Sequence, residues 1–147
     1  MRMQSFSPML SVLAISASIL CASPALADMM KMKATLDGAQ QNPPVTTAGK
    51  GRADLGFNTA TKQLSWNVTY SGLSGPATAG HIHGPAAKGE NAGVVVPFKG
   101  APKSPFKGAA ILTDAQAADL MAGKYYVNIH TAAHKDGEIR GQIEKAM

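Results

Sequence analysis

The sequence predicts an all-β fold, an antiparallel Greek-key sandwich or barrel with one short helix near residues 114–122. Short stretches in which apolar and polar residues alternate recur between residues 30 and 144, and such alternation is typical of half-buried strands. Turns rich in glycine and proline separate these stretches, and the chain has 15 Gly and 9 Pro. Many short strands joined by such turns are typical of sandwiches and barrels.

The clearest strands lie in the N-terminal half. Residues 30–36 alternate apolar side chains with Lys and Thr, and a proline-containing loop over residues 37–50 follows. Residues 53–57 and 64–70 alternate on either side of a polar turn, so they predict a β-hairpin. Trp66, on the apolar side of the second strand, is expected to anchor the core.

Further strands and the single helix follow. The strand over residues 78–83 ends at Gly84-Pro85, and the others are expected at residues 94–96 (short, buried and closed by Pro97), 107–112, 125–131 and 138–144. Thr113 and Gln116 fit a capping box, in which each side chain accepts from the other residue's backbone N–H. Apolar residues at helical spacing and Gly123 then predict a helix and its end.

Residues 1–27 resemble a secretory signal peptide. Arg2 precedes an apolar run from Met9 to Cys21, and Ala25-Leu26-Ala27 fits a small-x-small cleavage site. We expect a mature single domain over residues 28–147, periplasmic or secreted in a bacterium, with no transmembrane segment after cleavage. Cleavage would remove Cys21, the one cysteine, so disulfides and thiolate ligands are excluded from the mature domain.

The charge pattern argues against nucleic-acid binding. The chain carries 14 Lys+Arg against 9 Asp+Glu, a net charge of +5, but its lysines are scattered. No basic run is interleaved with aromatic residues, which a nucleic-acid surface would require. The positive charge is better explained as an aid to solubility.

The histidines are the candidate functional residues. His81 and His83 lie two residues apart, so in a strand both point to the face opposite Ile82. His130 alternates with Val127 and Ile129 in the same way. All three are therefore expected on the outer face of the sheet, where they could converge if the two strands are neighbours.

Three imidazoles with an open position suit a reactive metal, and imidazole is a ligand of copper and zinc. His134, on a turn, is a possible fourth ligand. Arg140, Asn128 and Glu138 are expected on the histidine face, where Arg140 could steer anions towards the metal and Asn128 and Glu138 could hydrogen-bond around it. The alternative is a polar surface network without metal.

Three motifs carry a resemblance to a known family: His81–Ala86, Tyr126–Thr131 and Gly137–Gln142. In this order and spacing they resemble the CHRD domain, which is named after chordin and occurs in exported bacterial proteins. The resemblance covers about residues 30 to 144 and implies an extracellular β-rich module, in chordin part of a growth-factor antagonist. Lys135 departs from the pattern, because many relatives have proline in this turn.

A weaker similarity is to Cu,Zn superoxide dismutase, a Greek-key β-barrel with a His-x-His pair, a later histidine and an arginine near the metal. His81, His83, His130 and Arg140 match those parts. The metal-bridging histidine, the full set of zinc ligands and the disulfide have no counterpart here.

These observations favour an exported binding module whose partner is a protein, a surface or a small molecule in the cell envelope, with a transition metal on the histidine cluster. The alternative is a periplasmic copper- or zinc-binding protein with dismutase-like or other metal-dependent activity. No catalytic residue is assigned, and the balance leans towards a protein that is not an enzyme.

Overall fold

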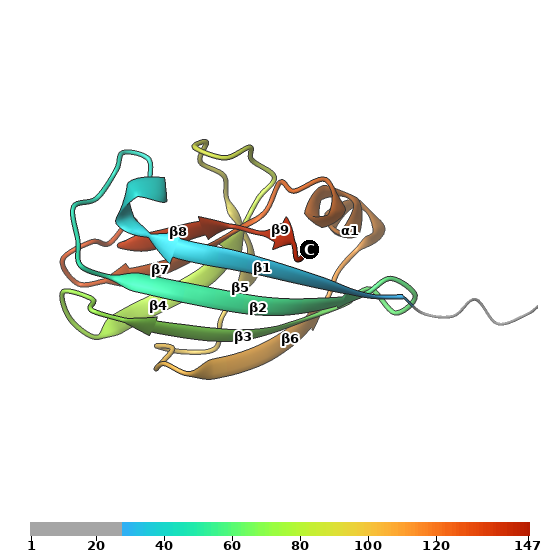
Figure 1. The fold of residues 1–147 in the computed structure, drawn as a ribbon, viewed down its shortest axis with the longest axis horizontal. Helices are drawn as coiled ribbons and strands as arrows, with labels where there is room; N and C mark the ends of the chain where they lie inside the picture. The colour runs from blue at the N-terminus through green and yellow to red at the C-terminus, as the bar shows by residue number, and fades with distance from the viewer. Residues whose placement is uncertain (1–27) are drawn as a thin grey trace, which may run out of the picture.

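The computed structural model describes residues 28–147, so the predicted signal peptide lies outside the described residues. Nine antiparallel strands form one sheet that curls into a nearly closed barrel with one short helix, as predicted (Figure 1). The elements are β1 (Met29–Asp37), the 3₁₀ turn η1 (Gly38–Gln40), β2 (Lys50–Asn58), β3 (Gln63–Ser71), β4 (Ala77–His83), β5 (Val94–Pro97), β6 (Phe106–Ile111), α1 (Asp114–Met121), β7 (Tyr126–Thr131), β8 (Ile139–Gln142) and β9 (Glu144–Lys145).

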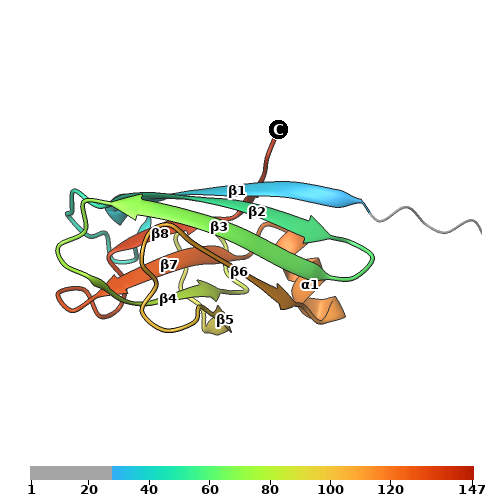
Figure 2. The same ribbon diagram turned by 90° about the horizontal axis from the view of Figure 1, so that it is seen from below.

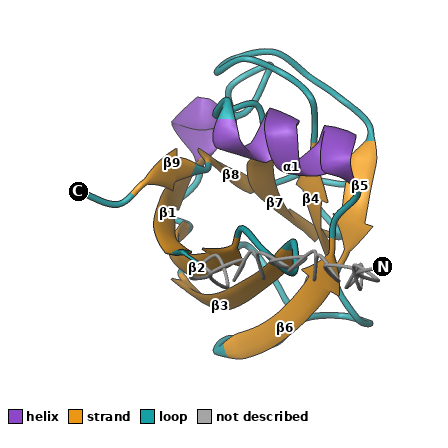
Figure 3. Cartoon of the chain, turned by 90° about the vertical axis from the view of Figure 1, so that its right-hand side faces the viewer, coloured by secondary structure: helices purple, strands orange, loops and turns teal. Residues whose placement is uncertain are grey.

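The strand order is β5-β4-β7-β8-β1-β2-β3-β6, with β9 paired to β1. Strands β1, β2 and β3 lie over β4, β7 and β8, which gives the barrel a flattened, two-layered shape (Figure 2). The chain leaves β3 to form β4 and β5 on the opposite side and then returns as β6 beside β3, a Greek-key connection. The free edges of β5 and β6 lie on the same side of the barrel, where it is not closed (Figure 3).

The core fills the space between the two layers. In the long strands the predicted alternation holds, so that Met32, Leu55 and Trp66 pair across β1, β2 and β3 and are all buried. Trp66 is 7% exposed, which confirms it as a core residue. Side chains that are directly opposite on antiparallel strands share a face, so this register places them all inside.

Helix α1 lies at one end of the barrel (Figures 1 and 3). The predicted capping box is present, with Thr113 and Gln116 each accepting from the other's backbone N–H. Gly123 follows with a φ of 74°, the left-handed conformation that commonly ends a helix. Ala117 and Leu120 face the core. No helix among residues 28–147 is long and apolar enough to cross a membrane.

Two details of the sequence prediction are wrong. The strand at residues 94–96 is not buried throughout, because β5 is an edge strand and Val94 is 51% exposed. The predicted strand 138–144 is divided into β8 and β9, with Ile143 between them.

The expected outer face of β7 and β8 is also not open to solvent. Every residue of the two strands is buried on both sides of the sheet. Loops cover this face, and the side chains beneath donate to their carbonyl groups: Arg140 to Glu90, and Gln142 to Ala86 and Gly123. The loop over residues 84–93 is named the covering loop below. Alternation alone does not reveal such a cover, because it depends on where distant loops return.

Candidate metal site

The pairing of β4 with β7 brings the histidines together. Ile82 lies opposite Val127 on the core side, while His81 lies opposite Asn128 and His83 opposite Tyr126. The adjacency of the two strands, which the sequence left open, is therefore present. The same regular register pairs His130 with Ala79, so that His130 lies next to His81 on the outer face.

His81, His83 and His130 form a compact cluster. Each offers a ring nitrogen, and these nitrogens all lie within 4.8 Å of one another. Nδ1 of His81 is 3.0 Å from Nε2 of His130, and the ring centroids of His81 and His83 are 5.4 Å apart. Three imidazole nitrogens that converge in this way are a ligand set that zinc and copper use in proteins.

Backbone carbonyl groups fix the proton positions on two of the rings. Nδ1 of His83 lies 3.0 Å from the carbonyl oxygen of Ala92, and Nδ1 of His130 lies 2.8 Å from that of Lys135. Because a carbonyl oxygen only accepts, both Nδ1 atoms carry the proton and both Nε2 atoms present a lone pair. His81 then donates through Nδ1 to His130. Carbonyl groups orient metal-binding histidines in this way in known metal sites.

Nε2 of His83 is buried and has no hydrogen-bond partner among the described residues. A buried nitrogen lone pair without a donor costs free energy, about 1–3 kcal/mol. Since Nδ1 of His83 already donates to Ala92, Nε2 is the nitrogen that His83 can offer to the cluster. It is therefore an unsatisfied acceptor at the point where a cation would be bound.

The surroundings favour neutral imidazoles. Burial lowers the pKa of His81, and the neighbouring His130 and His83 lower it further. Burial also lowers the pKa of His83. The hydrogen bond to Ala92 raises this pKa, while the charges of His130 and Arg140 lower it, and the net shift is downward. A lowered pKa keeps these rings neutral to more acidic pH than the ordinary 6.5, and a metal ligand must be neutral.

Tyr126 and Arg140 build the wall beside His83. The Tyr126 ring is stacked on His83, with centroids 5.0 Å apart and planes 4° from parallel. The Arg140 guanidinium carbon lies 3.5 Å from the centroid of the Tyr126 ring. Arg140 also donates to Oδ1 of Asn91 and to the carbonyl oxygen of Glu90, so it holds the covering loop over the site. Its side chain is 1% exposed, and its anion-steering role stays a prediction.

Asn128 fastens two further loops on the histidine face. Its Oδ1 accepts from Gln41 at 2.7 Å, and its Nδ2 donates to the carbonyl oxygen of Asp136 at 3.2 Å. Gly137 lies against it with a φ of 122°, and a Cβ there would come within 2.2 Å of Oδ1 of Asn128. Only glycine fits this turn, because it adopts the positive φ without strain and has no Cβ to clash with Asn128.

Glu138 does not lie with the histidines, so its expected position on their face is wrong. Its carboxylate accepts hydrogen bonds from Thr47, Ser74 and Thr131, each hydroxyl 2.6 Å away. Thr131 alternates with His130, which puts the carboxylate on the other side of β7. The unusual φ of Gly137 turns the chain just before Glu138, and this breaks the alternation that the sequence suggested.

The carboxylate of Glu138 is a structural link at one end of the barrel. Its burial alone would raise its pKa, but the hydrogen bonds from Ser74, Thr131 and Thr47 outweigh this and hold the pKa at about 2. It is ionised at neutral pH and fully hydrogen-bonded, which leaves it no role as a general base beside the cluster.

His134 lies outside the three-histidine group. It is half-buried on the turn after β7, where its backbone N–H bonds to Thr131. The group that the described residues bring together contains His81, His83 and His130.

Tyr126 and the two carbonyl groups that orient the rings were not among the predicted site residues. Tyr126 could have been found, because it alternates with Asn128 and His130 and so shares their face. The carbonyl oxygens of Ala92 and Lys135 could not, because a backbone acceptor leaves no mark in the side-chain pattern.

The comparison with known protein families identifies one match. The family model described as CHRD domain matches residues 32–143, a segment that includes all three histidines of the cluster. No curated protein and no solved structure matches the chain significantly.

Proposed function

Because this chain belongs to the CHRD-domain family, we propose that it is an exported binding module that holds one transition-metal ion, copper or zinc, through His81, His83 and His130. The observation that carries the proposal is the buried Nε2 of His83, which has a lone pair and no partner among residues 28–147. A cation bound there would satisfy this atom and would replace the hydrogen bond between His81 and His130, taking one ring nitrogen from each of them while the His81 proton moves to the nitrogen that does not bind the cation.

The ligand chemistry narrows the choice of metal. Three neutral imidazoles without a thiolate suit zinc and copper, whereas calcium and magnesium take oxygen ligands. His81 is the most exposed of the three rings, so we place the open coordination position on its side of the cluster. A solvent molecule or part of a partner would complete the coordination there.

The test is a calorimetric titration of metal-free protein with copper(II) and with zinc. We expect one equivalent to bind, and we expect the alanine variants of His81, His83 and His130 each to lose at least tenfold in affinity. His134→Ala is the matched control, because it removes a histidine that lies outside the cluster, and its affinity should stay within about twofold of the wild type.

A variant that merely unfolds would lose metal without informing the proposal. Circular dichroism of each variant therefore accompanies the titration, and His83→Gln serves as a second variant that keeps the size of the side chain. If the folded triple alanine variant takes up as much metal as the wild type, or if neither binds any, the cluster is a polar network and the proposal fails. A superoxide assay of the copper-loaded protein distinguishes a binding module from the dismutase-like alternative.

A further inference from the structure

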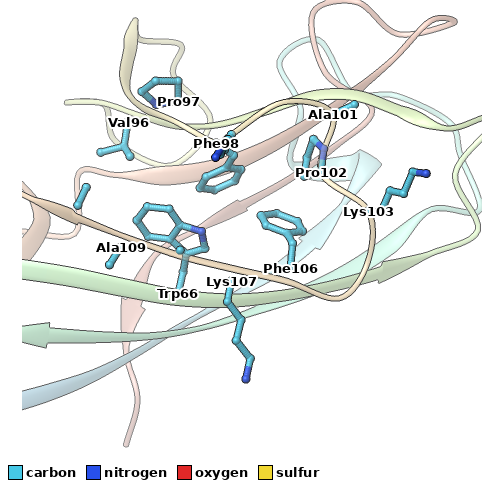
Figure 4. Close-up of a pocket in the computed structure, with 13 residues that line it drawn as sticks. Trp66, Val96, Pro97, Phe98, Ala101, Pro102, Lys103, Phe106, Lys107 and Ala109 are labelled. Atoms are coloured by element: carbon cyan, nitrogen blue, oxygen red, sulfur yellow. The ribbon is translucent and has the colours of Figure 1, made fainter.

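The free edges of β5 and β6 lie where the barrel is not closed (Figure 3). A groove lies there, lined by residues of both strands (Figure 4). Its volume is about 690 Å³, and its walls come from residues 96–99 and 101–103, from residues 106–110 and from Trp66 on β3. This volume is in the range of sites for small organic molecules. The histidine cluster is on the outer face of the sheet and shares no residue with this lining.

Aromatic side chains form the inner wall of the groove. The ring of Phe98 packs against Trp66 with centroids 5.2 Å apart and against Phe106 with centroids 5.1 Å apart (Figure 4). Two glycines make room for these rings. A Cβ at Gly108 would come within 2.5 Å of Trp66, and one at Gly80 within 2.8 Å of Phe98. Trp66 and Phe98 are each 7% exposed, so the apolar body of a ligand would contact the small exposed part of these two rings together with the half-buried ring of Phe106.

The charged side chains of the groove are all lysines. Lys99, Lys103 and Lys107 are among its lining residues, and no aspartate or glutamate is. The ion pairs found among residues 28–147 involve none of these three lysines. Lys103 lies beyond Phe106 at one end of the aromatic wall, and the side chains of Lys103 and Lys107 both extend away from the rings (Figure 4). The groove thus joins an apolar wall to a positively charged rim on the loop between β5 and β6.

We propose that this groove binds a single-chain amphipathic carboxylate of the size of a medium-chain fatty acid. The hydrocarbon chain would lie along Trp66, Phe98 and Phe106, and the carboxylate would pair with Lys103 and Lys99. From Phe106 to Ala110 the groove follows about 13 Å of strand, a length that suits an extended chain rather than a compact ring. An anionic head group complements the rim, because all of its charged side chains are lysines.

The test uses decanoate below its micellar concentration as the probe. Trp66 is the one tryptophan in the chain, so any change in tryptophan emission reports on the groove wall itself. We expect saturable binding of one equivalent, seen both as a shift in Trp66 emission and by calorimetry. Decylammonium, with the same chain and the opposite charge, should bind at least tenfold more weakly.

Two variants test the role of the rim. The double variant Lys99→Gln/Lys103→Gln should weaken decanoate binding at least tenfold, and both residues are exposed, so the fold should be kept. The double variant Lys31→Gln/Lys50→Gln removes the same two charges from exposed sites outside the groove and should leave binding within about twofold. The proposal is overturned if decanoate gives no saturable signal, if decylammonium binds as tightly as decanoate, or if the Lys99→Gln/Lys103→Gln variant binds decanoate like the wild type.

Discussion

Single side chains decide both the stability of this barrel and the chemistry of its outer face. Trp66 and Glu138 are both more than nine-tenths buried. Trp66 stabilises the fold by burying apolar surface, whereas Glu138 stabilises it through the hydrogen bonds that its charged carboxylate accepts. The burial of Trp66 could be predicted from the alternation of β3. The position of Glu138 could not, because two of its partners, Thr47 and Ser74, come from loops that are distant in sequence and meet the end of β7 only in the folded chain.

Truncation of Trp66 tests the core. We expect Trp66→Ala to lower the free energy of unfolding by roughly 3–5 kcal/mol, the range for deletion of a large aromatic side chain from a core. Trp66→Phe keeps an aromatic ring opposite Gly108 and should cost clearly less. Urea unfolding followed by circular dichroism measures both. An unchanged midpoint for Trp66→Ala would contradict the core assignment.

Acid should weaken the fold through Glu138. Its pKa of about 2 lies below the ordinary 4.5, so the ionised carboxylate stabilises the native state. This stabilisation is complete above about pH 4.5 and is lost as the pH falls towards 2. Glu138→Gln should be less stable than the wild type at pH 7, by roughly 1–3 kcal/mol, and its stability should fall less steeply between pH 4.5 and pH 2.

Urea unfolding at pH 7, 4.5, 3 and 2 measures this difference. Glu144→Gln is the control, because Glu144 is an exposed carboxylate in β9. Equal pH slopes for the wild type and Glu138→Gln would show that another group carries the acid sensitivity.

Among the elements, the covering loop and the strands beneath it illustrate what a periodic pattern can and cannot predict. The two-residue period placed His81 and His83 on one face and His130 opposite the core residues of its strand. That β4 and β7 are neighbours, although 49 positions separate His81 from His130, is a property of the topology. Arg140 links β8 to the covering loop. Its planar guanidinium suits this place because it can stack on Tyr126 and at the same time donate hydrogen bonds to the loop.

Replacement of Arg140 tests the attachment of the covering loop. In Arg140→Lys the ammonium cannot keep both the stacking on Tyr126 and the hydrogen bonds to Glu90 and Asn91. We expect faster proteolysis and faster amide hydrogen exchange within residues 84–93. Arg52→Lys is the matched control, since Arg52 pairs with Asp54 on an exposed part of β2. Equal exchange in both variants would mean that the loop is held by other contacts.

The whole molecule is an antiparallel barrel with a groove at its open side and a histidine cluster beneath loops. The sequence predicted the all-β class, the helix and the candidate histidines. It did not predict the groove, because Trp66, Phe98 and Phe106 come from three segments and their convergence depends on how the sheet curls. Nor could it tell an open outer face from a covered one.

Export concerns the molecule as a whole, and it stays a prediction that rests on the signal-peptide pattern of residues 1–27. We expect the protein recovered from the periplasm or the medium to begin at Asp28, after the Ala25-Leu26-Ala27 site. Intact mass and N-terminal sequencing measure this start. A product that retains Cys21, in particular with an attached lipid, would instead indicate a membrane anchor.

The open side of the barrel also bears on how the protein behaves when it is crowded. A free strand edge is a template on which another chain can add a strand, and this is a route to insoluble polymers. Here β5 is only four residues long and ends in Pro97, which has no N–H to offer, while β6 carries the exposed Lys107. The same two strands that leave the groove open are therefore poor templates, and the protein should remain monomeric and free of fibrils at concentrations where a Pro97→Val/Lys107→Val variant begins to polymerise.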